Sequence, residues 1–265
     1  MAKVIKISHY YEEIWKLKEV EPALLDALLS KDCLIEMVSG QPPFAVVIGV
    51  PHQAAVGVSR IADDWVNNEG VKGRNSDEGA AFHALVAFTA IRDRGIPCKL
   101  VIAAHDTQHD PNKVSSSPYW EAVFSDEMQL LFECHGARDD RNADLEISSG
   151  QNSLGNPLEF GRTLVRTLEF RYSLVAQAEP GSKKGILIEQ DGDKEAKLEN
   201  PANYTNSLIE AEKLKIPALH LEARPQFRIP EDQSNTVTPD GLILGRAIAK
   251  SFIEFSNHNS GRTNV

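Results

Sequence analysis

The sequence predicts an α/β fold with three layers, α/β/α, in which helices cover both faces of a mostly parallel mixed sheet. Short apolar runs rich in β-branched residues, such as residues 44–50 and 99–104, have the composition of strands that are buried on both faces. Helical patterns separate several of these runs along the chain. Alternation of this kind is typical of parallel strands joined by helical crossovers.

Each element is predicted from its local pattern. Residues 1–40 carry a mixed helical pattern, and we expect a helical N-terminal extension that packs on the main body. Residues 76–94 place apolar side chains on one helical face and end at Gly95, a common helix stop. Ser117 before Pro118 is typical of a helix start. The other predicted elements, in chain order, are strands at 129–134, 172–178, 185–189 and 216–223 and helices at 156–170, 208–214 and 241–255. We expect residues 1–265 to form a single domain.

Composition excludes several classes of protein. The 265 residues include 28 Lys+Arg and 38 Asp+Glu, so the net charge is 28 − 38 = −10. Nucleic-acid binding needs a basic surface, which this balance does not favour. The longest apolar run, residues 44–50, is far shorter than the roughly 20 residues of a membrane span. With no recognisable secretion signal and three cysteines in no metal or redox spacing, we expect a cytoplasmic protein with reduced thiols.

Metal-capable side chains follow the ends of several predicted strands. His52, His105 with Asp106, and His135 each lie just beyond an apolar run, and Glu222 lies at the end of another. The carboxyl ends of parallel strands form one edge of the sheet, and ligands bind there. Two imidazoles and one carboxylate, with a position left open for water, are the ligand set of a catalytic zinc site. The alternative for any one histidine is a hydrogen-bonded structural role.

Three carboxylates are candidates for roles at this edge. Asp77 and Glu78 open a predicted helix, and either could be the metal ligand; acids there also interact favourably with the helix dipole, by about 0.3–1 kcal/mol. Glu222 is a candidate general base, because burial at a strand end can raise the pKa of a carboxyl group. An ion pair between Glu222 and Arg224 or Arg228 is an equally good explanation.

The segment 105–113 is dense in polar groups. It could be a substrate-recognition loop held by the sheet, or a solvated turn built on Asp110-Pro-Asn. A further possibility is a metal bound by Asp106, His109 and Asp110.

Read in order, these segments resemble the N-formylglutamate amidohydrolase family, which belongs with the zinc carboxypeptidase-like hydrolases. The segments that carry the resemblance are Pro51-His52, Asp77-Glu-Gly-Ala80, Asp110-Pro-Asn-Lys113, Glu133-Cys-His-Gly136 and Leu221-Glu222-Ala-Arg. The resemblance covers about residues 44–255 and implies a phosphorylase/hydrolase-like fold.

The resemblance also implies roles for individual residues. Zinc would be bound by His52, His135 and a carboxylate at Asp77 or Glu78, and Glu222 would serve as the catalytic base. Asn112, Lys113 and Arg138 are implied to hold a substrate carboxylate, and Asp110 is a further substrate-binding candidate.

Three functions follow as hypotheses. The first is a zinc-dependent hydrolase that cleaves an amide bond of a small anionic N-acyl amino acid, such as N-formylglutamate. The second is a carboxypeptidase-like enzyme that acts on small peptides. The third is a non-catalytic small-molecule binding protein of the same fold, because His105-Asp106 and Lys113 stand where the family has Ser-Arg and Arg. None of the three involves nucleic acid or a membrane.

Overall fold

The computed structural model describes residues 3–7, 22–30, 33–56, 77–104, 111, 114–137, 144–149, 152, 154, 157–169, 186–188, 206–234 and 236–260. The strands are β1 (Lys3–Ile7), β2 (Cys33–Ser39), β3 (Val46–Ala54), β4 (Asp77–Glu78), β5 (Cys98–Ala104), β6 (Leu131–Gly136), β7 (Leu145–Ser148), β8 (Ile186–Ile188) and β9 (Ala218–Ala223). The helices are α1 (Pro22–Leu29), α2 (Ala80–Arg92), α3 (Pro118–Val123), α4 (Pro157–Glu169), α5 (Asn206–Lys213) and α6 (Pro239–Ser260), with a 3₁₀ turn at Pro225–Phe227.

One mixed sheet contains all nine of these strands. Its order is β1-β2-β5-β3-β6-β9-β7-β8, and β4 pairs with the end of β3. The four central strands β5, β3, β6 and β9 are parallel to one another, and β2 and β7 flank them in antiparallel orientation. The carboxyl ends of the central strands therefore meet at one edge, and the mostly parallel mixed sheet predicted from the sequence is confirmed.

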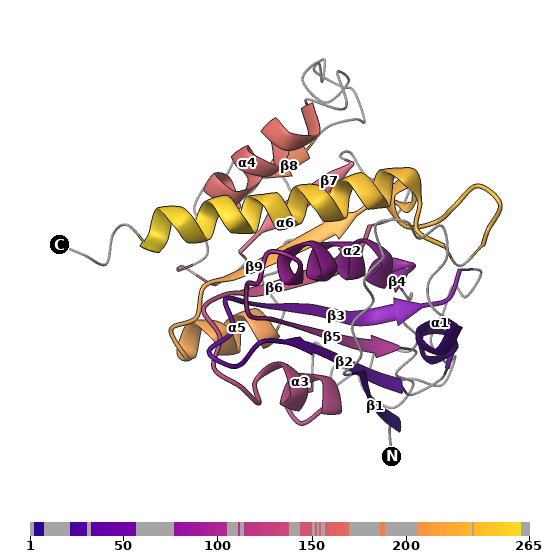
Figure 1. Ribbon diagram of the computed structural model, residues 1–265, viewed down its shortest axis with the longest axis horizontal. Coiled ribbons are helices and arrows are strands. Elements are labelled where there is room, and N and C mark those ends of the chain that lie inside the picture. Colours follow the sequence, from indigo (N-terminus) through magenta and orange to yellow (C-terminus); the bar gives the residue numbers. More distant parts are fainter. Residues whose placement is uncertain are drawn as a thin grey trace.

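Helices cover both faces of this sheet (Figure 1). On one face α1, α2, α4 and α6 enclose the larger apolar core, and on the other α3 and α5 enclose a smaller one. The packing of α2 against α6 depends on Gly245, because a Cβ atom there would meet the backbone of His83 and the side chain of Val86. The three-layer α/β/α architecture is thus confirmed. No helix of the described ranges has the length and apolar character needed to cross a membrane.

A buried lysine joins α3 to the sheet. The Lys99 ammonium donates hydrogen bonds to the carbonyl of Ala122 (2.7 Å), to Ser125 Oγ (2.8 Å) and to Asp126 Oδ2 (2.9 Å), and lies 3.2 Å from Glu36 Oε2. A buried charge is tolerated when it is paired and hydrogen-bonded in this way. This cluster is structural.

Two of the predicted elements are wrong. The N-terminal extension is not wholly helical, because residues 3–7 and 33–39 are strands β1 and β2, paired in parallel. Both segments contain β-branched residues, which favour strands. The predicted helix start at residue 76 is also wrong: Asp77 and Glu78 form β4 beside β3, and α2 begins at Ala80. The predicted strand at 172–178 lies outside the described residues.

Candidate metal and hydrolytic site

The end of β3 and the short strand β4 bring His52 and Asp77 together. A register shift between Val50 and Gln53 interrupts the β3–β5 ladder, and Gln53 pairs with Asp77 in β4. The buried Gln53 side chain accepts a hydrogen bond from the backbone N–H of Ala81 (2.7 Å), in the first turn of α2. This bond satisfies one of the unpaired donors at the start of the helix. This hydrogen bond links the end of β3 to the start of α2.

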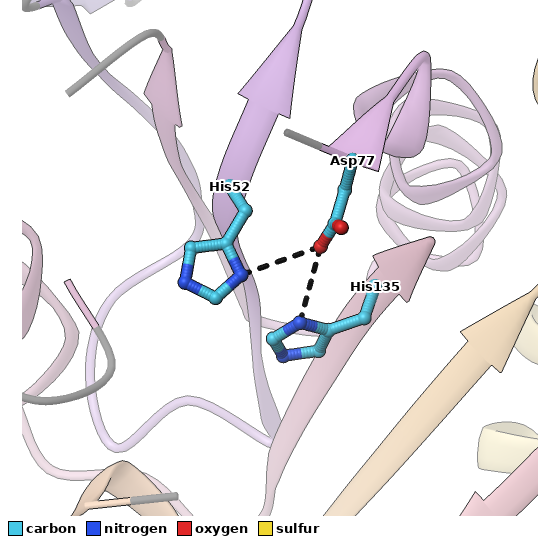
Figure 2. Close-up of side chains that lie close together, drawn as sticks. All are labelled: His52, Asp77 and His135. Atoms are coloured by element: carbon cyan, nitrogen blue, oxygen red, sulfur yellow. Dashed lines mark ion pairs between the residues drawn. The ribbon is translucent and has the colours of Figure 1, made fainter. Parts of the chain in front are cut away.

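His52, Asp77 and His135 point toward one another from β3, β4 and β6 (Figure 2). Asp77 Oδ2 lies 3.3 Å from His52 Nδ1 and 3.3 Å from His135 Nδ1. All three residues are buried, and the two imidazole rings meet edge to face with centroids 5.0 Å apart. One carboxylate oxygen therefore faces two ring nitrogens at the same distance.

The spacing of these atoms fits a metal ion. Ligand atoms about 2.0–2.1 Å from a tetrahedral zinc ion lie about 3.3 Å from each other. A charge-assisted hydrogen bond between an imidazole and a carboxylate is shorter, at about 2.7–2.9 Å. Buried carboxylates at Asp77, Glu133 and Glu222 surround His135, which favours a cation at this place. The three residues fit a zinc site on their own geometry.

The protonation of His135 depends on its carboxylate neighbours. Burial alone would lower the pKa of this imidazole, but the facing carboxylates of Asp77 and Glu133 and the charge of Glu222 raise it to about 10. Without a metal, His135 is therefore a cation at neutral pH. A metal at Nδ1 would replace a proton that the carboxylates already hold in place.

Glu222 lies beside this group on the same face of the sheet. It is buried and pairs with His135 in the β6–β9 register, and its Oε1 lies 3.1 Å from His220 Nε2. Burial raises the pKa of the Glu222 carboxyl, but the hydrogen bond and charge of His220 and the charge of His135 outweigh it, so the net pKa is lowered. The raised pKa considered from the sequence is therefore not found, and Glu222 is an anion at neutral pH. Since a carboxylate only accepts hydrogen bonds, His220 Nε2 is the donor.

Arg228 joins the strand ends that hold the site. Its buried guanidinium donates to the backbone carbonyls of Ala223 (2.8 Å) and Ala137 (2.9 Å) and to that of Glu78. These carbonyls lie at the ends of β9, β6 and β4. Gly136 leaves room for this guanidinium, and a Cβ atom there would displace it from its present position.

Replacing Arg228 with Met is expected to lower the free energy of unfolding by about 2–4 kcal/mol. The variant removes the Arg228 donor from three carbonyls, and of these the Ala223 carbonyl still accepts from the backbone N–H of Ala137 (2.8 Å). A buried unsatisfied group costs about 1–3 kcal/mol, part of which water can recover. Urea unfolding of the metal-free protein measures this. Arg224→Met is the control, since Arg224 pairs with Asp144 (3.1 Å) at the rim. Equal losses in the two variants would contradict the role of Arg228.

The structure shows which of the candidate residues predicted from the sequence lie at the site. Asp77, rather than Glu78, is the carboxylate that faces the two histidines, and the Glu78 side chain is half-buried. Neither arginine makes a described hydrogen bond with Glu222: Arg224 bonds to Asp144, and Arg228 bonds to carbonyls. The candidates that lie outside the described residues are His105, Asp106, His109, Asp110, Asn112, Lys113 and Arg138.

Sequence reasoning missed three residues of this face: Tyr119, Glu133 and His220. Glu133 and His220 each stand two residues before a candidate, His135 and Glu222, in an otherwise apolar strand. Because side chains two apart in a strand point to the same face, this spacing was an available signal. Cys134, between Glu133 and His135, points into the larger core on the opposite face of the sheet, as alternation along a strand requires.

No protein-family model and no curated protein sequence matches this chain. Among solved structures, the N-formylglutamate amidohydrolase from Ralstonia eutropha is similar over 86% of this chain and 98% of its own, with 11% identity and a TM-score of 0.48. A metallo-carboxypeptidase from Burkholderia cenocepacia is similar over 85% of this chain and 61% of its own, with 10% identity and a TM-score of 0.41. An N-acetylmuramyl-L-alanine amidase from Mycobacterium abscessus is similar over 82% and 99%, with 10% identity and a TM-score of 0.40. The two groups named by the sequence resemblance are thus among the structural neighbours.

Proposed function

We propose that this protein is a zinc-dependent hydrolase that cleaves an amide bond of a small, anionic N-acyl amino acid. The observation that carries the proposal is the meeting of His52, Asp77 and His135, with ligand-to-ligand distances of 3.3 Å, beside the anionic Glu222. These residues stand in the segments that resemble the N-formylglutamate amidohydrolase family. The substrate class follows from that resemblance.

Each residue has a distinct part in this reaction. His52, Asp77 and His135 would hold the zinc ion, which supplies a Lewis acid that polarises the substrate carbonyl and acidifies water. Glu222, as a carboxylate, accepts a proton from the attacking water and passes it to the leaving amine. His220 donates to Glu222 Oε1 and leaves Oε2 to take the proton. Asp110, Asn112, Lys113 and Arg138 remain the proposed substrate-binding residues.

Metal analysis combined with a substrate panel tests the proposal. Protein purified without chelators is expected to contain about one zinc per chain and to hydrolyse N-formyl or N-acetyl amino acids, with acidic ones preferred. Preference for short peptides with a free carboxyl terminus would favour the carboxypeptidase-like alternative. Binding of N-acyl amino acids without turnover, in zinc-loaded protein, would leave the binding-protein alternative. Absence of zinc binding would overturn the proposed site.

A further inference from the structure

Glu133 is a charged residue in the interior of the sheet. It lies on β6 between Phe132 and Cys134, which face the larger core, and its own side chain is fully buried on the opposite face. Burial of a carboxylate is costly unless both of its oxygens are matched by donors. Its two oxygens have different neighbours, which indicate what the residue does.

One oxygen of Glu133 is held by a tyrosine from α3. The Tyr119 hydroxyl donates to Glu133 Oε1 at 2.9 Å, and Tyr119 is itself buried. The hydroxyl reaches the carboxylate across Gly49 of β3, where a Cβ atom would overlap it. Three elements, α3, β3 and β6, therefore fix one oxygen in place.

The other oxygen of Glu133 faces a candidate metal ligand. Glu133 Oε2 lies 3.6 Å from His135 Nε2, whereas His135 Nδ1 lies 3.3 Å from Asp77 Oδ2. The two nitrogens of this imidazole thus have separate partners, Glu133 on one side and the candidate metal site on the other. His220 stacks on the same ring, with centroids 4.1 Å apart and planes inclined by 17°, which limits its rotation.

We propose that Glu133, held by Tyr119, is a positioning residue that fixes His135 with Nε2–H toward the sheet and Nδ1 toward the metal. A carboxylate on the second nitrogen sets the tautomer of a metal-binding histidine and makes it a better ligand. This inference rests on the proposed metal site. It assigns a role to two buried residues, Glu133 and Tyr119, that act through His135.

Zinc affinity of the full chain, measured by competition with a chelator at fixed pH, tests the proposal without any substrate. Glu133→Gln is expected to weaken zinc binding about 10- to 100-fold, the usual effect of losing such a partner. Tyr119→Phe keeps the ring and the carboxylate, and is expected to weaken binding by about 3- to 10-fold, below that range. Glu36→Gln is the matched control, because it makes the same change in the same sheet beside Lys99. We expect the control to bind zinc as the wild type does.

Two readouts separate positioning from a general structural role. Thermal unfolding of each metal-free variant reports stability alone, and a variant that is destabilised yet binds zinc normally overturns the proposal. Cobalt in place of zinc reports ligand geometry, and its visible bands are expected to shift in Glu133→Gln. If Glu133→Gln does not fold, Tyr119→Phe decides: wild-type zinc affinity and cobalt bands in that variant overturn the proposal.

The stoichiometry of the wild type separates the remaining outcomes. One zinc per chain, bound equally well by Glu133→Gln, overturns the positioning role and leaves the proposed metal site intact. No zinc in the wild type overturns both. Glu133, His135 and His220 also lie close enough together to bind a metal ion. Two zinc ions in the wild type, one of them lost in Glu133→Gln, would make Glu133 a ligand and overturn the proposal as stated.

Discussion

Replacing Glu222 with Gln is expected to lower kcat on the amide substrate by about 10²- to 10⁴-fold, with zinc content unchanged. The Glu222 carboxylate lies beside the candidate ligands and is anionic at neutral pH. His220 donates to its Oε1, so its Oε2 can accept a proton. Loss of a general base has an effect of this size. Steady-state kinetics and metal analysis of the same preparation measure it.

Glu146→Gln is the matched control for this prediction. Glu146 is also buried and stands directly opposite Glu222 in the antiparallel β7–β9 register, on the same face of the sheet. We expect this variant to keep kcat within about tenfold of the wild type, well short of losing a general base. The reverse result, with a large loss of kcat in Glu146→Gln and a small one in Glu222→Gln, would indicate that Glu146, on β7, is the general base. Loss of zinc in Glu222→Gln would show instead that Glu222 is a ligand.

The central fold could be predicted because its signals are local. Residues 46–50 of β3 and 100–104 of β5 form unbroken apolar runs, and a segment predicted as a helix lies between them, so both the elements and their parallel order follow. The strands β1 and β2 contain charged or partly exposed residues, such as Lys6 and Glu36, which blur the alternation. The two-residue strand β4 has no pattern of its own, since it exists through its pairing with β3.

The candidate site could be predicted as a set of strand ends but not as a geometry. His52 and His135 follow recognisable strands, and the rule that parallel strands end at one edge brings them together. The choice of Asp77 over Glu78 depends on the β4 pairing, which places Asp77 opposite Gln53. The roles of Glu133 and His220 depend on β6 and β9 being neighbours, and that order is a property of the whole sheet.

Replacing His135 with Ala is expected to weaken zinc binding by more than about 100-fold, because a ligand matters more than the partners that support it. The same histidine should make zinc binding depend on pH. In the metal-free protein its pKa is raised to about 10, so at neutral pH the metal must displace a proton from it. Zinc affinity of the wild type should therefore rise about tenfold per pH unit between pH 6.5 and 8.5 through this group. Calorimetry in buffers of different ionisation enthalpy counts the released proton.

The proton on His135 also links pH to the stability of the metal-free fold. Its folded pKa lies above the unfolded value of 6.5, so its stabilisation is fully present below pH 6.5 and is lost as the pH rises toward 10. Metal-free wild type should therefore unfold at a lower temperature at pH 9 than at pH 6.5, and His135→Ala should show a smaller decline. Stability and zinc affinity must then change in opposite directions with pH, because the metal and the proton compete for one imidazole. A wild type whose zinc affinity and metal-free stability both stay constant over this range would show that Asp77 and Glu133 do not hold a proton on His135.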